Sequence, residues 1–283
     1  MVSQLRQTRP DSSGHGAKRA RAASTGEPRL PHYLFRRWAE VSRRIRAAQH
    51  IVLFLDFDGT LAALRRYPRS VSLSQSTRRI IGSLARHPVL SIYVVSGRRL
   101  VDLRRRARMP GLHYVGLHGW EVRDGARLPA KTRKALQRAR KLIGDQLGNG
   151  RGIWLEDKEL SFGVHYHEAA QKVIRRAEAV VRRTLEHFEP HLRVLEGKKV
   201  WEFLPREIAG KGAAVLEVLA QLPAAPLTIY VGDDITDESA FAALPRGITV
   251  RVGKASDSTR ARFGLRNPAE VRCFLRKLEG EIN

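Results

Sequence analysis

Two carboxylates follow an unbroken apolar run early in the chain, within the segment Asp56-Phe57-Asp58-Gly59-Thr60. Because Asp56 and Asp58 lie two apart at the end of an extended run, both can reach one crevice where the chain turns, and Gly59 frees the backbone for that turn. Burying two like charges is costly unless they share a cation or a proton. A phosphatase does both: one carboxylate binds Mg²⁺ and attacks phosphorus, and the other carries a proton. Taken alone, the segment is also compatible with a turn whose aspartates only cap backbone amides.

Two later segments offer groups that hold a phosphoryl group. Ser96, at the end of the next apolar run, provides a hydroxyl, and Gly97 beside it allows close approach of the backbone. Lys211 lies between two glycines at the start of a helical pattern. Its ammonium group would place a positive charge near the transferring phosphorus, and the amides of the helix N-terminus would add to that field.

A third acidic segment, Gly232-Asp233-Asp234, follows another apolar run. Carboxylate oxygens are the hard ligands that Mg²⁺ prefers, and Asp237 and Glu238 lie just beyond. Each of these residues alone would be an ordinary turn or surface residue. Their order at the ends of separate apolar runs favours a phosphoryl-transfer site.

The elements that would position these residues alternate between strand and helix. Such alternation predicts a doubly wound, Rossmann-like parallel α/β sheet. The polar segments then fall at the carboxyl ends of strands, where ligands bind in such sheets. The expected strands are 51–55, 89–95, 113–117, 227–231 and 248–252, and the expected helices are 32–48, 74–87, 210–221, 237–244 and about 268–279.

The middle of the chain has a different pattern. It contains two basic helical stretches, 131–147 and 168–187, and two strand-like runs that resemble a half-exposed antiparallel sheet. We therefore predict an inserted α+β cap domain. The predicted division of the chain is a disordered basic tail (1–30), a core in two parts (31–125 and 206–283) and the cap (126–205).

The composition narrows the possible partners. The net charge of +24 raises the question of nucleic acid, but the arginines are spread over the chain and no aromatic residues interleave with them as stacking platforms. We interpret them as a solvated basic surface. No apolar run approaches the roughly 20 residues that span a bilayer, so no membrane association is expected. The single cysteine, Cys273, excludes an internal disulfide and fits a cytoplasmic protein.

The four polar segments, DFDGT, SGR, the isolated Lys211 and GDD, match the motifs of the haloacid dehalogenase superfamily, and the insert resembles its second cap class. Within that superfamily the chain resembles the trehalose-6-phosphate phosphatases over about 31–280. The segments that carry this closer resemblance are GLHGWE (116–121), LEDKELSFGVHYH (155–167), EGKKVWEFLP (196–205) and VGDDITDESAF (231–241).

The resemblance implies Mg²⁺-dependent hydrolysis of trehalose 6-phosphate to trehalose and phosphate, the final step of trehalose biosynthesis. Asp56 would form an aspartyl phosphate, and Asp58 would act as acid and then as base. Mg²⁺ would be held by Asp56, the Asp58 backbone carbonyl and Asp233, with Asp234 or Asp237 orienting ligands.

Other residues would hold the phosphoryl group and the sugar. The resemblance assigns Thr60, Ser96 and Lys211 to the phosphoryl group, whereas Arg98 either clamps phosphate or pairs with a neighbouring acid. Trp201 would pack on a sugar face. The residues expected to bind the substrate are Thr60, Ser96, Gly97, Arg98, His118, Glu156, Lys158, His165, Lys198 and Glu202.

The chain departs from the family pattern at two positions that we expect on the substrate side. His167 and Leu204 stand where the family usually has arginine. A phosphatase for another sugar phosphate, such as sucrose 6-phosphate or mannosyl-3-phosphoglycerate, is therefore the alternative. A nucleic-acid-binding protein on a phosphatase-like fold is a more remote one, and the intact acidic motifs argue against it. The expected partner is a small sugar phosphate, and the sequence predicts no oligomeric state.

Overall fold

The computed structural model describes residues 29–64, 71–121, 127–148, 152–197, 199–254 and 258–283. Its core is a seven-stranded sheet in the order β1-β11-β10-β9-β2-β3-β4, and every neighbouring pair in it is parallel. The strands are β1 (His32–Tyr33), β2 (Ile51–Asp56), β3 (Leu90–Val95), β4 (Leu112–Val115), β9 (Leu227–Gly232), β10 (Ile248–Val252) and β11 (Phe263–Leu265).

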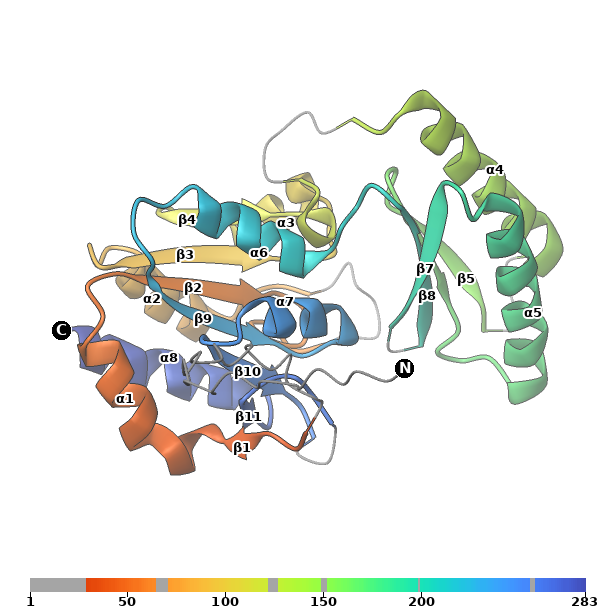
Figure 1. Ribbon diagram of the computed structural model, residues 1–283. Helices are drawn as coiled ribbons and strands as arrows, with labels where there is room; N and C mark the ends of the chain where they lie inside the picture. Colours follow the sequence, from red (N-terminus) through yellow and green to blue (C-terminus); the bar gives the residue numbers. More distant parts are fainter. Residues whose placement is uncertain (1–28, 65–70, 122–126, 149–151, 198, 255–257) are drawn as a thin grey trace, which may run out of the picture.

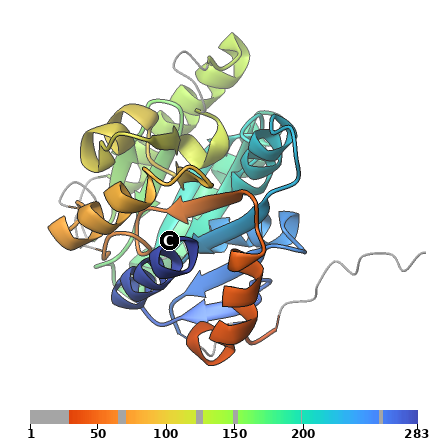
Figure 2. The same cartoon turned by 90° about the vertical axis from the view of Figure 1, so that its left-hand side faces the viewer.

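Helices cover both faces of this sheet (Figures 1 and 2). Ile51, Leu53 and Leu55 of β2 pack into one apolar cluster with α1, α2, α3 and α8, whereas Val52 and Phe54 pack on the other face with α6 and α7. This alternation explains why the run is apolar throughout. The helices are α1 (Trp38–Arg46), α2 (Gln75–Leu84), α3 (Leu100–Ala107), α6 (Lys211–Ala220), α7 (Glu238–Ala243) and α8 (Pro268–Ile282), with short 3₁₀ helices η1 (Leu34–Arg37), η3 (Leu117–Gly119) and η4 (Ile235–Asp237).

The inserted segment forms a two-layer unit, one sheet and two helices, beside the core (Figure 1). Its antiparallel sheet has the order β5-β6-β8-β7, and α4 and α5 cover one face. The elements are α4 (Ala130–Leu147), β5 (Trp154–Asp157), β6 (Phe162–His165), α5 (Gln171–Phe188), β7 (Leu192–Gly197) and β8 (Val200–Pro205).

The register of the cap sheet separates its two faces. Phe162 and Val164 lie opposite Phe203 and Trp201, and all four belong to the apolar cluster under the helices. Because strand side chains alternate, their neighbours in sequence point to the opposite face. The face without helices therefore carries His165 and Glu202 beside the apolar Val200 and Leu204, and it is the one that meets the core.

The predicted fold class is confirmed, as is the antiparallel cap sheet. The short strands β1 and β11 were not predicted, and the expected helix over 32–48 begins instead as a strand and a 3₁₀ turn before α1. The predicted domain boundaries stay a prediction. Residues 1–28 of the predicted tail lie outside the described residues, while Arg29 forms a backbone bridge with Thr259. Within the described residues, no helix is long and apolar enough to cross a membrane.

Candidate active site

The end of β2 delivers Asp56 to the carboxyl edge of the core sheet. Gly59 follows with a φ of +86°, and its amide donates to the carbonyl of Ala62 at 2.7 Å. A Cβ atom on Gly59 would lie 2.2 Å from Oδ2 of Asp233. Both the turn and the close approach therefore require glycine, and the turn brings the acidic residues after β2 and β9 together.

Lys211 lies between two buried carboxylates. Its Nζ donates to Oδ1 of Asp56 and to Oδ1 of Asp237, each at 2.7 Å, and the lysine side chain is 2% exposed. Tyr230 also donates to Oδ1 of Asp237, at 2.8 Å. The pKa of Lys211 is raised: burial opposes the ammonium form, but the two aspartates outweigh it. The lysine is therefore a fixed positive charge at the base of the site.

Asp56 combines deep burial with an oxygen that is not hydrogen-bonded. Its Oδ2 has no hydrogen-bond partner among the described residues. Burial raises the pKa of Asp56, and the nearby Asp237 and Asp233 raise it further, while Lys211 opposes them. A carboxylate held by one oxygen with the other directed at no protein donor has the arrangement that a nucleophile needs.

Carboxylate oxygens of Asp56, Asp233 and Asp237 all lie within 4.8 Å of one another. Gly232 leaves room for the carboxylate of Asp237, since a Cβ atom there would lie 2.3 Å from Cγ of Asp237. These buried acids form a group that could hold a metal ion. The carboxylates of Asp58 and Asp234 are not in this group. Asp58 was expected to bind the metal through its backbone carbonyl, so that role stays a prediction.

Asp234 has a structural task in this arrangement. Its Oδ1 accepts a hydrogen bond from the amide of Ile235 at 2.8 Å, and its own amide donates to Oδ2 of Asp237 at 2.9 Å, as in a capping box of η4. Asp234 thus orients Asp237, while its side chain also lines the cleft described below.

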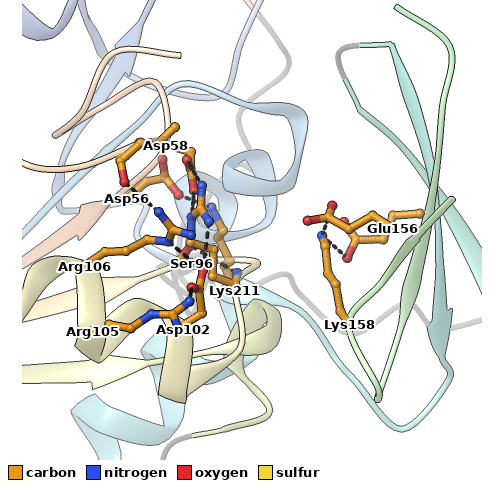
Figure 3. A network of polar contacts seen from close by, with 12 residues as sticks. Asp56, Asp58, Ser96, Asp102, Arg105, Arg106, Glu156, Lys158 and Lys211 are labelled. Carbon is orange, nitrogen blue, oxygen red and sulfur yellow. Dashed lines mark hydrogen bonds and ion pairs between the residues drawn. The ribbon is translucent and has the colours of Figure 1, made fainter. Parts of the chain in front are cut away.

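Asp58 is held by Arg98. The guanidinium donates from Nε to Oδ2 at 2.6 Å and from Nη2 to Oδ1 at 2.7 Å. Its third nitrogen donates to Asp102 at 2.9 Å, and Asp102 also accepts from Arg105 and Arg106 (Figure 3). Burial favours neutral Asp102, but the arginines prevail and hold its pKa far below the usual range. Arg98 therefore pairs with neighbouring acids, one of the two roles left open by the sequence.

Ser96 and Gly97 lie at the end of β3. Ser96 lines the cleft and its Oγ accepts from the amide of Arg98 at 3.2 Å. A Cβ atom on Gly97 would lie 2.6 Å from Cε1 of His118, so this glycine makes room for the histidine ring. His118 has a φ of +54° and is buried. Thr60 is fully buried and is not among the residues that line the cleft.

Four expected substrate residues of the cap lie together on its open face. Lys158 donates to Glu202 at 2.8 Å and lies 3.8 Å from Glu156, which contacts His165 at 3.0 Å. Glu202 also lies 3.2 Å from Nε2 of His118, across the boundary between cap and core. Burial would raise the pKa of Glu202, but Lys158 and His118 together hold it well below the usual range. The cap face thus carries a linked group of charged and polar side chains.

The cap group faces the core group across a cleft (Figure 3). The volume of the cleft is about 230 Å³, and it is lined from both sides. The sequence-predicted residues that line it are Asp56, Asp58, Ser96, Gly97, Arg98, His118, Glu156, Lys158, His165, Glu202, Lys211, Asp233 and Asp234.

One expectation for the cap is wrong. Trp201 is 5% exposed and stacks on Tyr166 beneath the helices, because it lies one residue from Glu202 and so points the other way. Leu204 lies on the same face of the sheet as Glu202, but it packs in an apolar cluster with Leu117 and Ile208 and is not among the residues that line the cleft. Of the two departures from the family pattern, only His167 lines the cleft. Lys198 lies outside the described residues.

Some residues of the site were not identified from the sequence. Tyr230 is a polar residue inside the apolar run of β9, and Asp102 is the single acid among the arginines of α3. Each residue differs in polarity or charge from the other residues of its strand or helix, and this difference was the signal in the sequence that could have identified it. Trp154, rather than Trp201, is the tryptophan on the open face, where it stacks on His165 with ring centroids 3.8 Å apart.

Comparisons with known proteins agree with this geometry. A family model described as Trehalose-phosphatase matches residues 54–268. Two proteins named trehalose-phosphate phosphatase, from Mycobacterium ulcerans and Mycobacterium tuberculosis, are 34% and 35% identical over 82% and 83% of this chain. The chain spans 62% and 63% of the length of those relatives.

The fold has solved counterparts. The C-terminal domain of Candida albicans trehalose-6-phosphate phosphatase matches with a TM-score of 0.78 at 20% identity, over 90% of this chain and 99% of that one. At this identity the likeness concerns the fold alone. The overall fold of the described chain is therefore shared with that domain.

Proposed function

The chain belongs to the trehalose-phosphatase family, and on that premise we propose that it hydrolyses trehalose 6-phosphate with Asp56 as the nucleophile and Mg²⁺ as the cofactor. The observation that carries the proposal is the state of Asp56. It is buried and lines a cleft, accepts a hydrogen bond from Lys211 through one oxygen, and has no hydrogen-bond partner on the other among the described residues.

The buried aspartates fit a magnesium ion. All donors in the group are carboxylate oxygens, and their mutual repulsion contributes to the raised pKa of Asp56. A cation would offset that repulsion, as Lys211 does in part. Asp56, Asp233 and Asp237 are the residues that would hold it. When bound, the ion would neutralise charge on the phosphoryl oxygens.

The chain's own residues supply the covalent steps. Oδ2 of Asp56 forms a bond to phosphorus while the bond from phosphorus to the sugar oxygen breaks, and that oxygen takes the proton of the Asp58 carboxyl. Water then attacks the phosphorus of the aspartyl phosphate, gives its proton to Asp58, and releases phosphate and free Asp56. Lys211 and Ser96 hold the phosphoryl oxygens between these steps. Asp58 must turn from Arg98 toward the leaving oxygen for the proton to move.

The cap group is suited to a polyhydroxyl leaving group. Glu156, Lys158, His165 and Glu202 offer charged donors and acceptors within one buried face of the cleft. Sites that hydrogen-bond many hydroxyls discriminate strongly against analogues that lack them, because their buried polar groups are then left unpaired. We therefore assign sugar recognition to this face.

Phosphate release from a panel of sugar phosphates, with and without Mg²⁺, tests the proposal. We expect trehalose 6-phosphate to give the highest kcat/KM and chelation to abolish turnover. Faster turnover of sucrose 6-phosphate or mannosyl-3-phosphoglycerate would reassign the substrate. Asp56→Asn should lower kcat by about 10³-fold or more in a folded protein, and activity near that of the unmodified chain would exclude the covalent route.

A further inference from the structure

Arg99 connects the core to the cap. It precedes α3, next to the Ser96-Gly97-Arg98 segment, and its guanidinium reaches residues of both layers. Nε donates to Oε1 of Glu121 at 2.6 Å in the core. Nη1 donates to the backbone carbonyl of Lys158 at 3.4 Å and pairs with the carboxylate of Glu159 in the cap. One side chain thus spans the boundary between the two layers.

The contact between Arg99 and Glu121 in the core is firmly held. The side chain of Glu121 is only 8% exposed, and its second oxygen accepts from the amide of Leu100 at 2.6 Å. The backbone of Glu121 pairs with Gly116 in an isolated bridge. Removing either partner of a buried ion pair leaves an uncompensated charge, so Arg99 is held by Glu121 whatever the cap does.

The contact between Arg99 and Glu159 in the cap is easily broken. Glu159 is 79% exposed, and exposed ion pairs contribute little because water competes for both charges. Glu159 has a φ of +62°, in the left-handed region that favours glycine, and its amide donates to Oδ1 of Asp157 at 2.9 Å. A glycine would suit this backbone better, so the contribution of Glu159 at this turn is its carboxylate.

The turn that Arg99 contacts carries a residue of the cleft. Lys158, whose carbonyl accepts from Arg99, extends its ammonium group into the cleft beside Glu202 and Glu156. We propose that Arg99 is a positioning residue that docks the β5–β6 turn on the core and so sets the place of the Lys158 ammonium on the sugar-binding face of the cleft. This inference rests on the proposed function, since it assigns Lys158 to substrate recognition.

An arginine that only stabilises the fold could make the same contacts as one that docks the cap over the substrate. The two roles are distinguished by their effects on kinetics. If Arg99 docks the cap, its loss should impair turnover of a substrate whose sugar binds to the cap. Turnover of a substrate without a sugar should change much less. p-Nitrophenyl phosphate has no sugar hydroxyls and serves as the second kind. A purely structural role predicts equal losses on both substrates.

The test compares Arg99→Ala, Arg99→Lys and Glu159→Gly in the full chain. We expect Arg99→Ala to raise KM for trehalose 6-phosphate about tenfold or more while kcat/KM for p-nitrophenyl phosphate stays within about twofold. Glu159→Gly keeps the turn and removes only the exposed pair, so its KM should rise about two- to fivefold. Arg99→Lys keeps the charge and should recover part of the loss. Arg37→Ala, which removes an exposed pair with Glu40 on α1, is the control.

A distance measurement makes the test independent of the substrate. Spin labels on Cys273, which is exposed on α8, and on Arg182→Cys, which is exposed on α5, report the separation of core and cap. We expect Arg99→Ala to broaden this distance distribution and Arg37→Ala to leave it unchanged. An unchanged distribution, or an equal loss on both substrates, overturns the inference. If the unmodified chain fails to hydrolyse trehalose 6-phosphate, the proposed function fails while the distance measurement still decides the docking role.

Discussion

Arg98 donates two parallel hydrogen bonds to the carboxylate of Asp58, from Nε at 2.6 Å and from Nη2 at 2.7 Å. The guanidinium is itself fixed by Asp102, so Asp58 is tied to the first turn of α3. Bidentate pairs of this kind impose geometry as well as energy. Asp58 is thus kept beside the nucleophile in one orientation until it leaves the pair to exchange a proton.

Replacement of Arg98 should therefore lower kcat more than it raises KM. We expect Arg98→Lys, which keeps a charge but cannot bind both oxygens, to reduce kcat about 10- to 100-fold, because a misplaced acid–base group loses most of its effect. Steady-state kinetics with trehalose 6-phosphate measures this. Arg105→Ala is the matched control, since it removes one exposed hydrogen bond to Asp102 and leaves Arg98 in place. Equal kinetics of the lysine variant and the unmodified chain would show that the bidentate contact has no catalytic role.

Gly59→Ala should damage the metal site. The added methyl group would lie 2.2 to 2.6 Å from the carboxylate atoms of Asp233, at a φ that disfavours side chains. We expect the Mg²⁺ concentration for half-maximal activity to rise about tenfold and the stability to fall by about 1–3 kcal/mol. Titration with Mg²⁺ and thermal unfolding check both. Gly280→Ala on α8 meets no atom within 4 Å and should stabilise the protein slightly. An unaltered Mg²⁺ requirement in Gly59→Ala would count against Asp233 as a ligand.

The carboxyl-edge cluster was predictable because its residues follow apolar runs. Asp56, Ser96 and Asp233 each come directly after a buried strand or within a residue of its end, and parallel strands bring those ends to one edge. The alternation of apolar strands with helices, together with the glycines and polar residues that follow each strand, was enough to locate them.

Contacts between distant residues were not predictable in this way. Trp201 was expected on a sugar face, but neither alternation nor residue type says which side of a strand meets the helices; the pairing of Trp201 with Val164 decides it. Arg98 has one partner four residues away, Asp102, and pairing with a neighbouring acid was one of the two roles left open for it. Its pairing with Asp58, 40 residues away, and that of Arg99 with Glu121, 22 residues away, could not be read from the nearby sequence. Tertiary register, rather than local propensity, determines this half of the site.

The two tryptophans of the cap sheet should differ sharply when removed. Trp201→Ala opens a cavity under α4 and α5 and should cost about 3–5 kcal/mol of stability. Trp154→Ala removes the ring that stacks on His165 at the cleft, so we expect a several-fold higher KM with a small change in melting temperature. Unfolding curves and sugar-phosphate kinetics on both variants separate the effects. A reversed pattern would mean that the faces of the cap sheet are assigned incorrectly.

Acid should weaken the cap through Glu202. Burial works against its charge, yet Lys158 and His118 hold its pKa in the folded protein well below the ordinary value of 4.5. A depressed carboxyl pKa stabilises the folded state fully above the unfolded value and loses that contribution as pH falls toward the folded value. We therefore expect urea stability to decrease from about pH 4.5 downward. Glu202→Gln cannot ionise, and it should be less stable at pH 7 because Lys158 keeps a buried charge with a weaker partner. The difference in unfolding free energy between the two proteins should shrink as pH is lowered to 3, and a difference that stays constant from pH 7 to pH 3 would contradict the depressed pKa.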